Sequence, residues 1–525
     1  MALMNYDAIV VGAGHNGLAC AVHLATRGWK VLVLEQAAVA GGAVKTAEIT
    51  RPGFRHDMYA MNVGSFAGSA FHAEHGGLLA RHGLGFVPAS KPFASVFADG
   101  SPRWIAVEQG LEATISHIRR ASERDAQAWR DMSKRFDREG PHLLAMLGTP
   151  MPSWALAKAG WRMWRELGTT GMADTGRLLL GSSRAWLGSR FESDAVRTLL
   201  ATWGMHLDLA PDVAGGALFP YLEAMLDQRH GMALGKGGAD VIVRAMVSAV
   251  QSAGGEVRTS AKVARIHVVD GRARSVELAT GERFEARRAV VANVHPKALY
   301  GTLLREAAPG DSATARALRP GPATMMVHLA LDALPRWRAG AELQSFAYVH
   351  LARSIDHLAQ VYGQAMAGQL PAEPVLVVGQ PTVFDPSRAP PGQHVLWVQV
   401  RVLPAVVRGD FAGSLAPAPW DELKEAYADR VMDLLEAHAP GLRASVLGRC
   451  VLSPADLERD NPNLVGGDNL AGSHQLDQFF VFRPAVGRSH WRTGVSQLFH
   501  VGASTWPGAG TGAGSGYMLG RELAS

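Results

Sequence analysis

The feature that most constrains the fold is a glycine-rich turn between two apolar stretches near the start of the chain. Residues 6–11 are apolar except for Asp7, the turn spans 12–17, and residues 18–26 carry small side chains typical of a packed helix. A second apolar run, residues 30–35, closes the unit. Strands that are apolar throughout belong in a parallel sheet covered on both faces. The sequence therefore predicts a βαβ unit whose helix begins at a glycine turn.

The turn matches the GxGxxG pattern of dinucleotide sites. In such sites the first glycine allows a tight turn, the second lets the backbone approach a pyrophosphate, and the third lets the helix pack on the strand. Glu35 ends the second strand about 20 residues later, where an acidic side chain accepts hydrogen bonds from a ribose diol. An ordinary strand-turn-helix is the alternative. The predicted contacts in this unit are Gly12, Ala13, Gly14, His15, Asn16, Gly17, Glu35 and Gln36.

Further glycine-rich stretches favour FAD over NAD. A glycine pair follows Glu35 closely, a Gly-Lys-Gly-Gly turn at 235–238 precedes a predicted helix at 239–252, and the chain ends with a short strand at 498–501, a glycine loop and a helix. FAD is long, so its isoalloxazine needs an anchor beyond the pyrophosphate. The cofactor contacts predicted in these stretches are Gly41, Gly42, Ala43, Gly502, Ala503, Gly508, Gly510 and Gly512.

The nucleotide-type patterns lie at the beginning, the middle and the end of the chain, so one domain is expected to form from separated segments. The predicted fold class is α/β, with a discontinuous Rossmann-type FAD-binding domain and an inserted mixed α+β substrate domain. Residues 1–65, 230–300 and 490–525 are assigned to the first domain, and 66–229 and 301–489 to the substrate or cap domain. Within the latter, 66–229 is read as helical, and Asp270-Gly271 and Thr280-Gly281 are read as hairpin turns in the middle segment.

The chain resembles phytoene desaturase-like flavoproteins of the amine-oxidase superfamily. Gly14-His15-Asn16-Gly17, the glycine pair, the 235–238 turn and the glycine-rich ending carry the resemblance, together with 381–394, 476–478 and Arg483-Pro484. It is close to desaturase-like β-carotene ketolases and to the pyridine nucleotide-disulphide oxidoreductase domain-containing group. The resemblance implies non-covalent FAD, with the backbone of Val263 beside the adenine and 508–512 beside the flavin.

Three departures from the family pattern lie near the expected reaction site. Ala43 follows the glycine pair where relatives carry Arg or Thr, Trp506 replaces a frequent His, and extra glycines precede Tyr517. Trp506, Tyr517 and His56 are the candidates for side chains that line the flavin, with a role as buried core residues as the alternative for each. No catalytic acid-base pair is evident.

The resemblance implies an FAD-dependent oxidoreductase that removes hydride from an apolar carotenoid- or isoprenoid-like substrate. The alternatives are a flavin amine oxidase or other small-molecule dehydrogenase, which would place a lysine and an aromatic cage beside the flavin, and a non-catalytic interaction role. The electron acceptor is not evident, and oxygen or a quinone would serve.

Composition narrows the partners and the location. The net charge is +5 without a long Lys/Arg block, which argues against nucleic-acid binding. The cysteines Cys20 and Cys450 are far apart, so neither a disulphide framework nor a metal site is expected. No stretch has a signal-peptide pattern or spans a bilayer, and a cytoplasmic location is expected. Trp154, Trp161 and Trp164 alternate with Lys and Arg, which suits peripheral membrane contact or a surface helix that covers the core.

Overall fold

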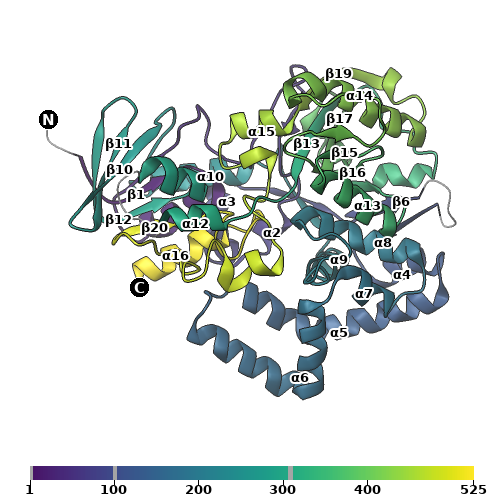
Figure 1. Cartoon of the computed structure of the whole chain (residues 1–525), viewed down its shortest axis with the longest axis horizontal. Helices are drawn as coiled ribbons and strands as arrows, with labels where there is room; N and C mark the ends of the chain where they lie inside the picture. Colours follow the sequence, from purple (N-terminus) through teal and green to yellow (C-terminus); the bar gives the residue numbers. More distant parts are fainter. Residues whose placement is uncertain (1–3, 98–102, 305–310) are drawn as a thin grey trace.

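A computed structural model describes residues 4–97, 103–304 and 311–525 and shows two sheet-based lobes with a helical projection (Figure 1). The first sheet has five parallel strands in the order β9-β2-β1-β12-β20, and β12 continues into an antiparallel meander with β11 and β10. The strands are β1 (Met4–Val11), β2 (Val31–Leu34), β9 (Glu256–Arg258), β10 (Val263–Val269), β11 (Arg272–Leu278), β12 (Arg283–Ala292) and β20 (Leu498–His500).

Strands from the beginning, the middle and the end of the sequence therefore share one sheet. Four helices accompany it: α1 (His15–Ala25), α3 (Ala70–Arg81), α10 (Val241–Ser252) and α16 (Gly514–Ala524). The last helix packs directly on α1, and Figure 1 shows the yellow end of the chain beside the purple start. Their apolar side chains form one buried cluster with strands β1 and β2. The cluster also holds Phe71 and Leu79 of α3, although the predicted domain boundary falls at residue 65.

The second sheet has seven strands in the order β19-β13-β17-β16-β14-β6-β7, and only the β14–β6 pair among them is parallel. Helix α14 (Trp420–His438) shares its buried cluster. The strands are β6 (Phe93–Val96), β7 (Trp104–Val107), β13 (Ala323–Leu331), β14 (Tyr348–Leu351), β16 (Val375–Gly379), β17 (His394–Leu403) and β19 (Val446–Leu452). Two-strand pairs β3–β4 (Thr46–Ala47, His56–Asp57), β5–β8 (Phe86–Ala89, Met232–Gly235) and β15–β18 (Gln369–Leu370, Gly409–Asp410) complete the strands.

The helical projection extends from the second lobe at the bottom of Figure 1. It is formed by α5 (Glu123–Leu147) and α6 (Trp154–Leu180). Helices α4 (Leu111–Arg119), α8 (Asp194–Ala201) and α9 (Leu218–His230) pack against strands of the second sheet, and α7 (Ser183–Gly188) follows α6. Helix α6 bends at Gly168, whose φ of +68° lies outside the helical range. Every helix in the described ranges is too short or too polar to cross a lipid bilayer.

The structure confirms the predicted α/β fold class, including both hairpins of the β10–β12 meander. The expectation that residues 66–229 are helical is wrong at its start, where β5, β6 and β7 form. β5 pairs with β8 and β6 pairs with β14, and both partners follow more than 100 residues later along the chain, while β7 pairs with β6. Such non-local pairing leaves no short-range signal beyond a brief apolar run.

Candidate functional site

A cavity of about 250 Å³ lies where the two sheets and the tail of the chain meet. The start of α1, the second glycine loop and the loops before and after Trp506 form one wall. Residues of β14, β17, α9 and the turn at 202–207 form the other. The predicted residues that line it are Gly14, His15, Asn16, Gly42, Ala43, Gly502, Ala503 and Gly510. Residues from the first 45 and from the last 25 positions of the sequence thus share one wall.

Asn293, the residue after β12, explains why the first turn needs its glycines. Its amide nitrogen donates to the carbonyl oxygens of Gly12 and Gly14, at 3.2 and 3.4 Å. A Cβ added to Gly14 or Gly17 would lie 2.9 Å from that nitrogen. Sequence reasoning missed Asn293, because one asparagine after an apolar strand matches no pattern.

The first turn of α1 offers free backbone donors to the cavity. Gly14 is the N-cap, and within the described residues no side chain caps the first N–H groups of the helix. Such groups, with the positive end of the helix dipole, form an anion site suited to a pyrophosphate. Asn16, in the same turn, is buried and lines the cavity.

Glu35 is held at the end of β2, away from the cavity. Its carboxylate accepts hydrogen bonds from the N–H groups of Ala13 at 2.8 Å and Ala37 at 2.9 Å, and the residue is 8% exposed. Gln36 is exposed. Val263 begins β10, two residues after Ala261, whose N–H donates to the carbonyl of Glu35 at 2.7 Å. These residues lie together at the end expected for the adenosine, and their contacts with it remain predictions.

The second glycine pair touches the first turn directly. The N–H of Gly41 donates to the carbonyl of Ala13 at 3.0 Å, and a Cβ added to Gly42 would lie 3.2 Å from the Cα of Gly14. Gly42 has a φ of +59°, in the left-handed region. A side chain at either glycine loop would push the loops apart.

The tail of the chain completes the same wall. The N–H of Val501 donates to the carbonyl of Ala292 at 3.0 Å, which continues the β12–β20 pairing. Gly502 has a φ of +119°, and a Cβ there would lie 2.8 Å from Oδ1 of Asn293. His15 Nε2 lies 3.0 Å from the carbonyl oxygen of Gly510, to which it donates. Burial lowers the pKa of His15 to about 4, so this imidazole is neutral near pH 7.

Arg483 holds this tail in place through hydrogen bonds to its backbone. The residue carries part of the family resemblance. Its buried guanidinium donates to the carbonyl of Ala503 at 2.6 and 3.0 Å and to that of Ser473 at 2.6 Å. Burial lowers its pKa to about 9, and the charge of Asp468 opposes that shift. The ring of carbonyl dipoles compensates a cation that forms no ion pair with the described part of the chain.

His474 holds the glycine loop and was not found from the sequence. Its Nε2 accepts the N–H of Ala509 at 2.9 Å, and its Nδ1 donates to the carbonyl of Gly472 at 3.1 Å. Burial keeps the pKa of His474 well below its usual value, which fits this neutral tautomer. A Cβ on Gly508 would lie 2.5 Å from that Nε2. Gly512 packs against the backbone of Ser65.

Trp506, Tyr517 and His56 are not among the lining residues of the cavity. Trp506 is fully buried, donates its indole N–H to Thr149 at 2.8 Å and stacks on Phe480. Tyr517 packs between α1 and α3. His56 bonds to the hydroxyl of Thr50 at 2.7 Å, and burial lowers its pKa to about 3. All three are core side chains in this structure.

Tyr517 contacts a cluster of three potential metal ligands, which are His23, Glu74 and His75. One ligand atom from each lies within 4.8 Å of the others. Their polar groups are already paired: Tyr517 donates to Glu74, Arg27 donates to Glu74 at 2.8 Å, and the two imidazoles bond at 3.1 Å. The cluster therefore serves to join α1, α3 and α16.

Aromatic rings dominate the wall opposite the glycine loops. Trp203, Phe219, Tyr348 and Trp397 line it, with the Tyr348 and Trp397 rings stacked at 5.6 Å. Four polar side chains lie among them: His206, Glu223, Gln399 and Arg401. Burial raises the pKa of Glu223 to about 7. The wall combines large apolar surfaces with a few polar groups, as small-molecule sites do.

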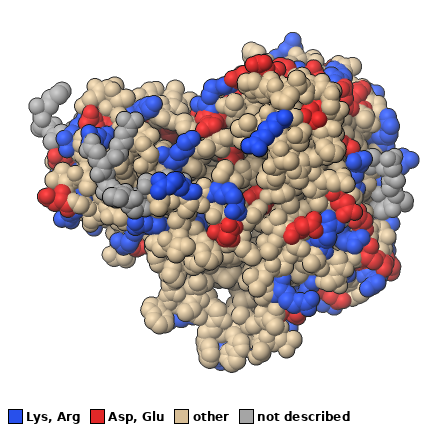
Figure 2. Space-filling view, viewed as in Figure 1, with Lys and Arg blue, Asp and Glu red and all other residues tan. Residues whose placement is uncertain are grey.

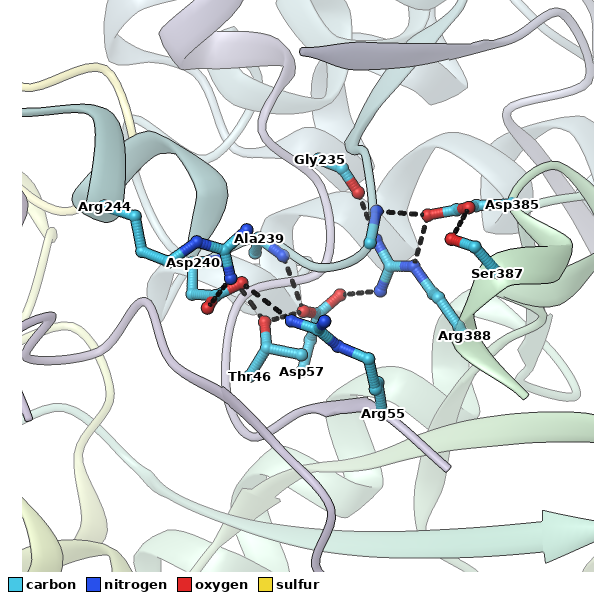
Figure 3. Close-up of polar contacts among 11 residues, drawn as sticks. Thr46, Arg55, Asp57, Gly235, Ala239, Asp240, Arg244, Asp385, Ser387 and Arg388 are labelled. Carbon is cyan, nitrogen blue, oxygen red and sulfur yellow. Dashed lines mark hydrogen bonds and ion pairs between the residues drawn. The ribbon is translucent and has the colours of Figure 1, made fainter. Parts of the chain in front are cut away.

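The Gly-Lys-Gly-Gly turn lies outside the cavity, in a buried charge network between the lobes (Figure 3). Arg388 is fully buried, pairs with Asp57 and Asp385, and donates to the carbonyl of Gly235 at 2.7 Å. Asp57 also accepts the N–H of Ala239 at 2.7 Å. The turn and the 381–394 motif that carried part of the resemblance therefore lock the two lobes together.

The residues of the cavity fit an FAD molecule. The uncapped start of α1 suits the pyrophosphate, and the absence of a Cβ at Gly14, Gly42 and Gly502 lets the three loops that line the cavity pack closely around Asn293 and one another. Glu35 lies at the end of the neighbouring strand, as a ribose partner requires. FAD supplies hydride acceptance when it is bound.

Comparison with known proteins agrees with an FAD site. The chain is 28% identical to mouse pyridine nucleotide-disulfide oxidoreductase domain-containing protein 2 and to a limonene dehydrogenase polypeptide of Castellaniella defragrans, covering 99% of this chain and 94% of each relative. It is 24% identical to the neurosporene-forming phytoene desaturase of Cereibacter sphaeroides, over 96% of this chain and 91% of the relative. The predicted resemblance to phytoene desaturases is thereby confirmed.

Solved structures share the fold. An oxidoreductase from Methanosarcina mazei matches with a TM-score of 0.64 and 18% identity, over 99% of this chain and 100% of that one. Cyclohexylamine oxidase from Brevibacterium oxydans matches with a TM-score of 0.59 and 17% identity, over 99% and 98%. The family model of flavin-containing amine oxidoreductases matches residues 17–444. The chain therefore belongs to this family and is an FAD-dependent oxidoreductase.

Proposed function

We propose that this oxidoreductase removes hydride from a C–H bond of a substrate with an apolar, isoprenoid-like body. The observation that carries the proposal is that glycine loops fit for FAD and the aromatic side chains Trp203, Tyr348 and Trp397 line one cavity. Aromatic faces bind hydrocarbon chains and exclude water. Limonene and phytoene, which name two of the relatives, are hydrocarbons of this class.

The protein's part in the reaction is to bind, orient and shield the substrate. Tyr59, Phe219 and the stacked pair Tyr348–Trp397 provide the apolar contact. Hydride removal from a C–H bond must be matched by loss of a proton from the neighbouring carbon, which leaves a C=C bond. One proton acceptor suffices for this, so the other polar residues of the wall are available for recognition of a substituent.

Oxidation of an amine is the second candidate, since cyclohexylamine oxidase shares the fold and Glu223 lies among aromatic rings. Two features favour the first proposal. No lysine from the described ranges lines the cavity, and the guanidinium of Arg401 does. A buried cation repels a substrate ammonium group.

The proposal includes contact between α6 and an anionic lipid surface that holds the apolar substrate. On α6, Trp154 is 85% exposed, Trp161 59% and Trp164 43%. Lys158, Arg162 and Arg165 are exposed on the same helix. Figure 2 shows the projecting lobe as largely uncharged with blue groups among the tan. Tryptophan with basic residues is typical of helices that lie in the membrane interface. A quinone in such a membrane, or oxygen, would serve as electron acceptor.

The test is anaerobic reduction of the FAD-loaded protein by a panel of polyenes, monoterpenes and amines, followed by flavin absorbance. Bleaching by an isoprenoid compound, and re-oxidation by a quinone or oxygen, is the expected result. Bleaching by amines alone would replace the proposal with the second candidate.

A further inference from the structure

Arg401 on β17 is a buried cation that the protein itself leaves largely unpaired. The residue is 3% exposed and lines the cavity. Its Nη2 donates to the carbonyl of Met205 at 3.2 Å, and its Nε has no hydrogen-bond partner. Within the described ranges it forms no ion pair.

Two other buried arginines have the partners that Arg401 lacks. Arg388 has two carboxylates, and Arg483 has a ring of carbonyl oxygens. The acid whose charge acts on Arg401 is Asp468, but that carboxylate already accepts three backbone N–H groups at 2.8 Å each. A buried charge without a partner costs several kcal/mol. An anion that enters the cavity would recover that cost.

Other hydrogen-bond donors gather around the same place. Gln399 lies two residues earlier on β17, on the same face of the strand, and its amide has no partner within the described ranges. In the described part of the chain, His206 Nε2 and the indole nitrogen of Trp203 also have no hydrogen-bond partner, and both residues line the cavity with their rings 4.6 Å apart. Glu223 carries only part of a negative charge near pH 7, because burial raises its pKa to about 7.

We propose that Arg401, with Gln399 and His206, binds the carboxylate of the substrate, so that the substrate is an acid with an apolar body. Guanidinium and carboxylate form strong charge-assisted hydrogen bonds in a desolvated site. Arg401 is a binding residue for the end of the molecule that does not react. The inference rests on the proposed function and narrows it to apolar carboxylic acids.

The test uses the oxidised, FAD-loaded protein and matched probes: geranic acid with geraniol, and retinoic acid with retinol. Binding is followed by the change in flavin absorbance. The wild type should bind each acid at least about 10-fold more tightly than its alcohol. Arg401→Gln should lose acid affinity by at least about 30-fold, with alcohol affinity unchanged within about 3-fold. Equal binding of acid and alcohol by the wild type would overturn the inference.

Two further measurements keep the result interpretable. The flavin content and reduction potential of Arg401→Gln should match the wild type. A shifted potential with equal losses for acid and alcohol would assign Arg401 to the flavin and overturn the inference. If Arg401→Gln does not fold, Gln399→Met must show the same selective loss for the acids, at about 3- to 10-fold for a neutral donor, and an equal loss for acid and alcohol there would overturn the inference.

The outcomes also separate this inference from the proposed function. One outcome is that acids bind through Arg401 while, of the panel, an amino acid such as phenylalanine alone bleaches the flavin. That outcome would support the carboxylate site and contradict the proposal of an isoprenoid substrate. If isoprenoid alcohols bleach the flavin while acids bind no better in the wild type than in Arg401→Gln, the proposed function stands and the carboxylate site does not.

Discussion

A Cβ added to Gly516 would lie 1.7 Å from the backbone oxygen of Asn16. Helix α16 therefore crosses the first turn of α1 with the two backbones in direct contact, at the turn that lines the cavity. The glycines before Tyr517 had stood out in the sequence as a departure from the family pattern. At position 516, the glycine is required by this close approach.

Gly516→Ala should displace α16 and weaken FAD binding. A methyl group against a backbone atom forces the helices apart, and we expect unfolding free energy to fall by at least about 2 kcal/mol. Chemical denaturation and FAD titration measure both effects. Gly363→Ala is the matched control, since that helical glycine has open space around it and should gain up to about 1 kcal/mol. Equal unfolding free energies and FAD affinities in the two variants would contradict the close contact between α16 and α1.

Arg388→Met should be among the most destabilising single changes in the chain. It leaves the carboxylates of Asp57 and Asp385 buried without their cation, which costs about 3–5 kcal/mol. Arg244→Met removes the half-exposed partner of Asp240 in the same network and should cost at most about 1 kcal/mol (Figure 3). Denaturant unfolding should rank the two variants clearly, and similar losses would mean that the inter-lobe network is not held by Arg388.

Stability should fall as the pH drops below about 6.5. Burial lowers the pKa of His15, His295 and His500 to about 4 in each case and that of His56 to about 3. The unfolded chain binds these protons near pH 6.5, so it takes up more protons than the folded chain between pH 6.5 and 4. The contribution of these four histidines to the free energy of unfolding is therefore fully present above pH 6.5 and is lost as the pH falls from 6.5 to 4.

Thermal and denaturant unfolding at pH 7.5, 6.0 and 5.0 measure this slope. Each such histidine contributes about 1.4 kcal/mol per pH unit within the window. His500→Gln, which can still donate to Val294, should flatten the slope by about one proton. An unchanged slope in that variant would show that His500 titrates normally.

The double variant Trp154→Ser/Trp161→Ser should bind poorly to anionic vesicles. Sedimentation with vesicles of phosphatidylglycerol and phosphatidylcholine should show at least about 10-fold weaker binding than the wild type, because two interfacial side chains are lost. Phe411→Ser, at a ring that is 63% exposed elsewhere on the surface, is the control and should bind like the wild type. Absence of vesicle binding by the wild type would remove lipid contact from the proposal.

The backbone of the nucleotide half could be predicted from sequence because its signals are local. The Gly12–Gly17 turn, the hairpin glycines and the apolar strands each specify structure within a few residues. The side chains that complete the site could not be predicted in this way. Asn293, His474 and Arg401 are single polar residues whose roles depend on contacts with segments distant in sequence.

Whether an aromatic ring lies in the core or lines the cavity was the hardest feature to predict from the sequence. Trp506 and Trp203 both lie in apolar surroundings, yet Trp506 packs in the core and Trp203 lines the cavity. Position beside a glycine-rich motif does not say to which side of the backbone a ring points. That orientation depends on the loop that covers Trp506, where Phe479 and Phe480 contact it.

The central claim is that distant segments of the chain build one FAD site, and FAD titration of three single variants tests it most directly. Gly14→Ala, Gly42→Ala and Gly502→Ala each add one methyl group, at the first turn, the second loop and the tail. We expect the wild type to bind one FAD per chain and all three variants to lose at least about 10-fold in affinity. Wild-type affinity in Gly502→Ala, with binding lost in Gly14→Ala, would show that the tail is not part of the site.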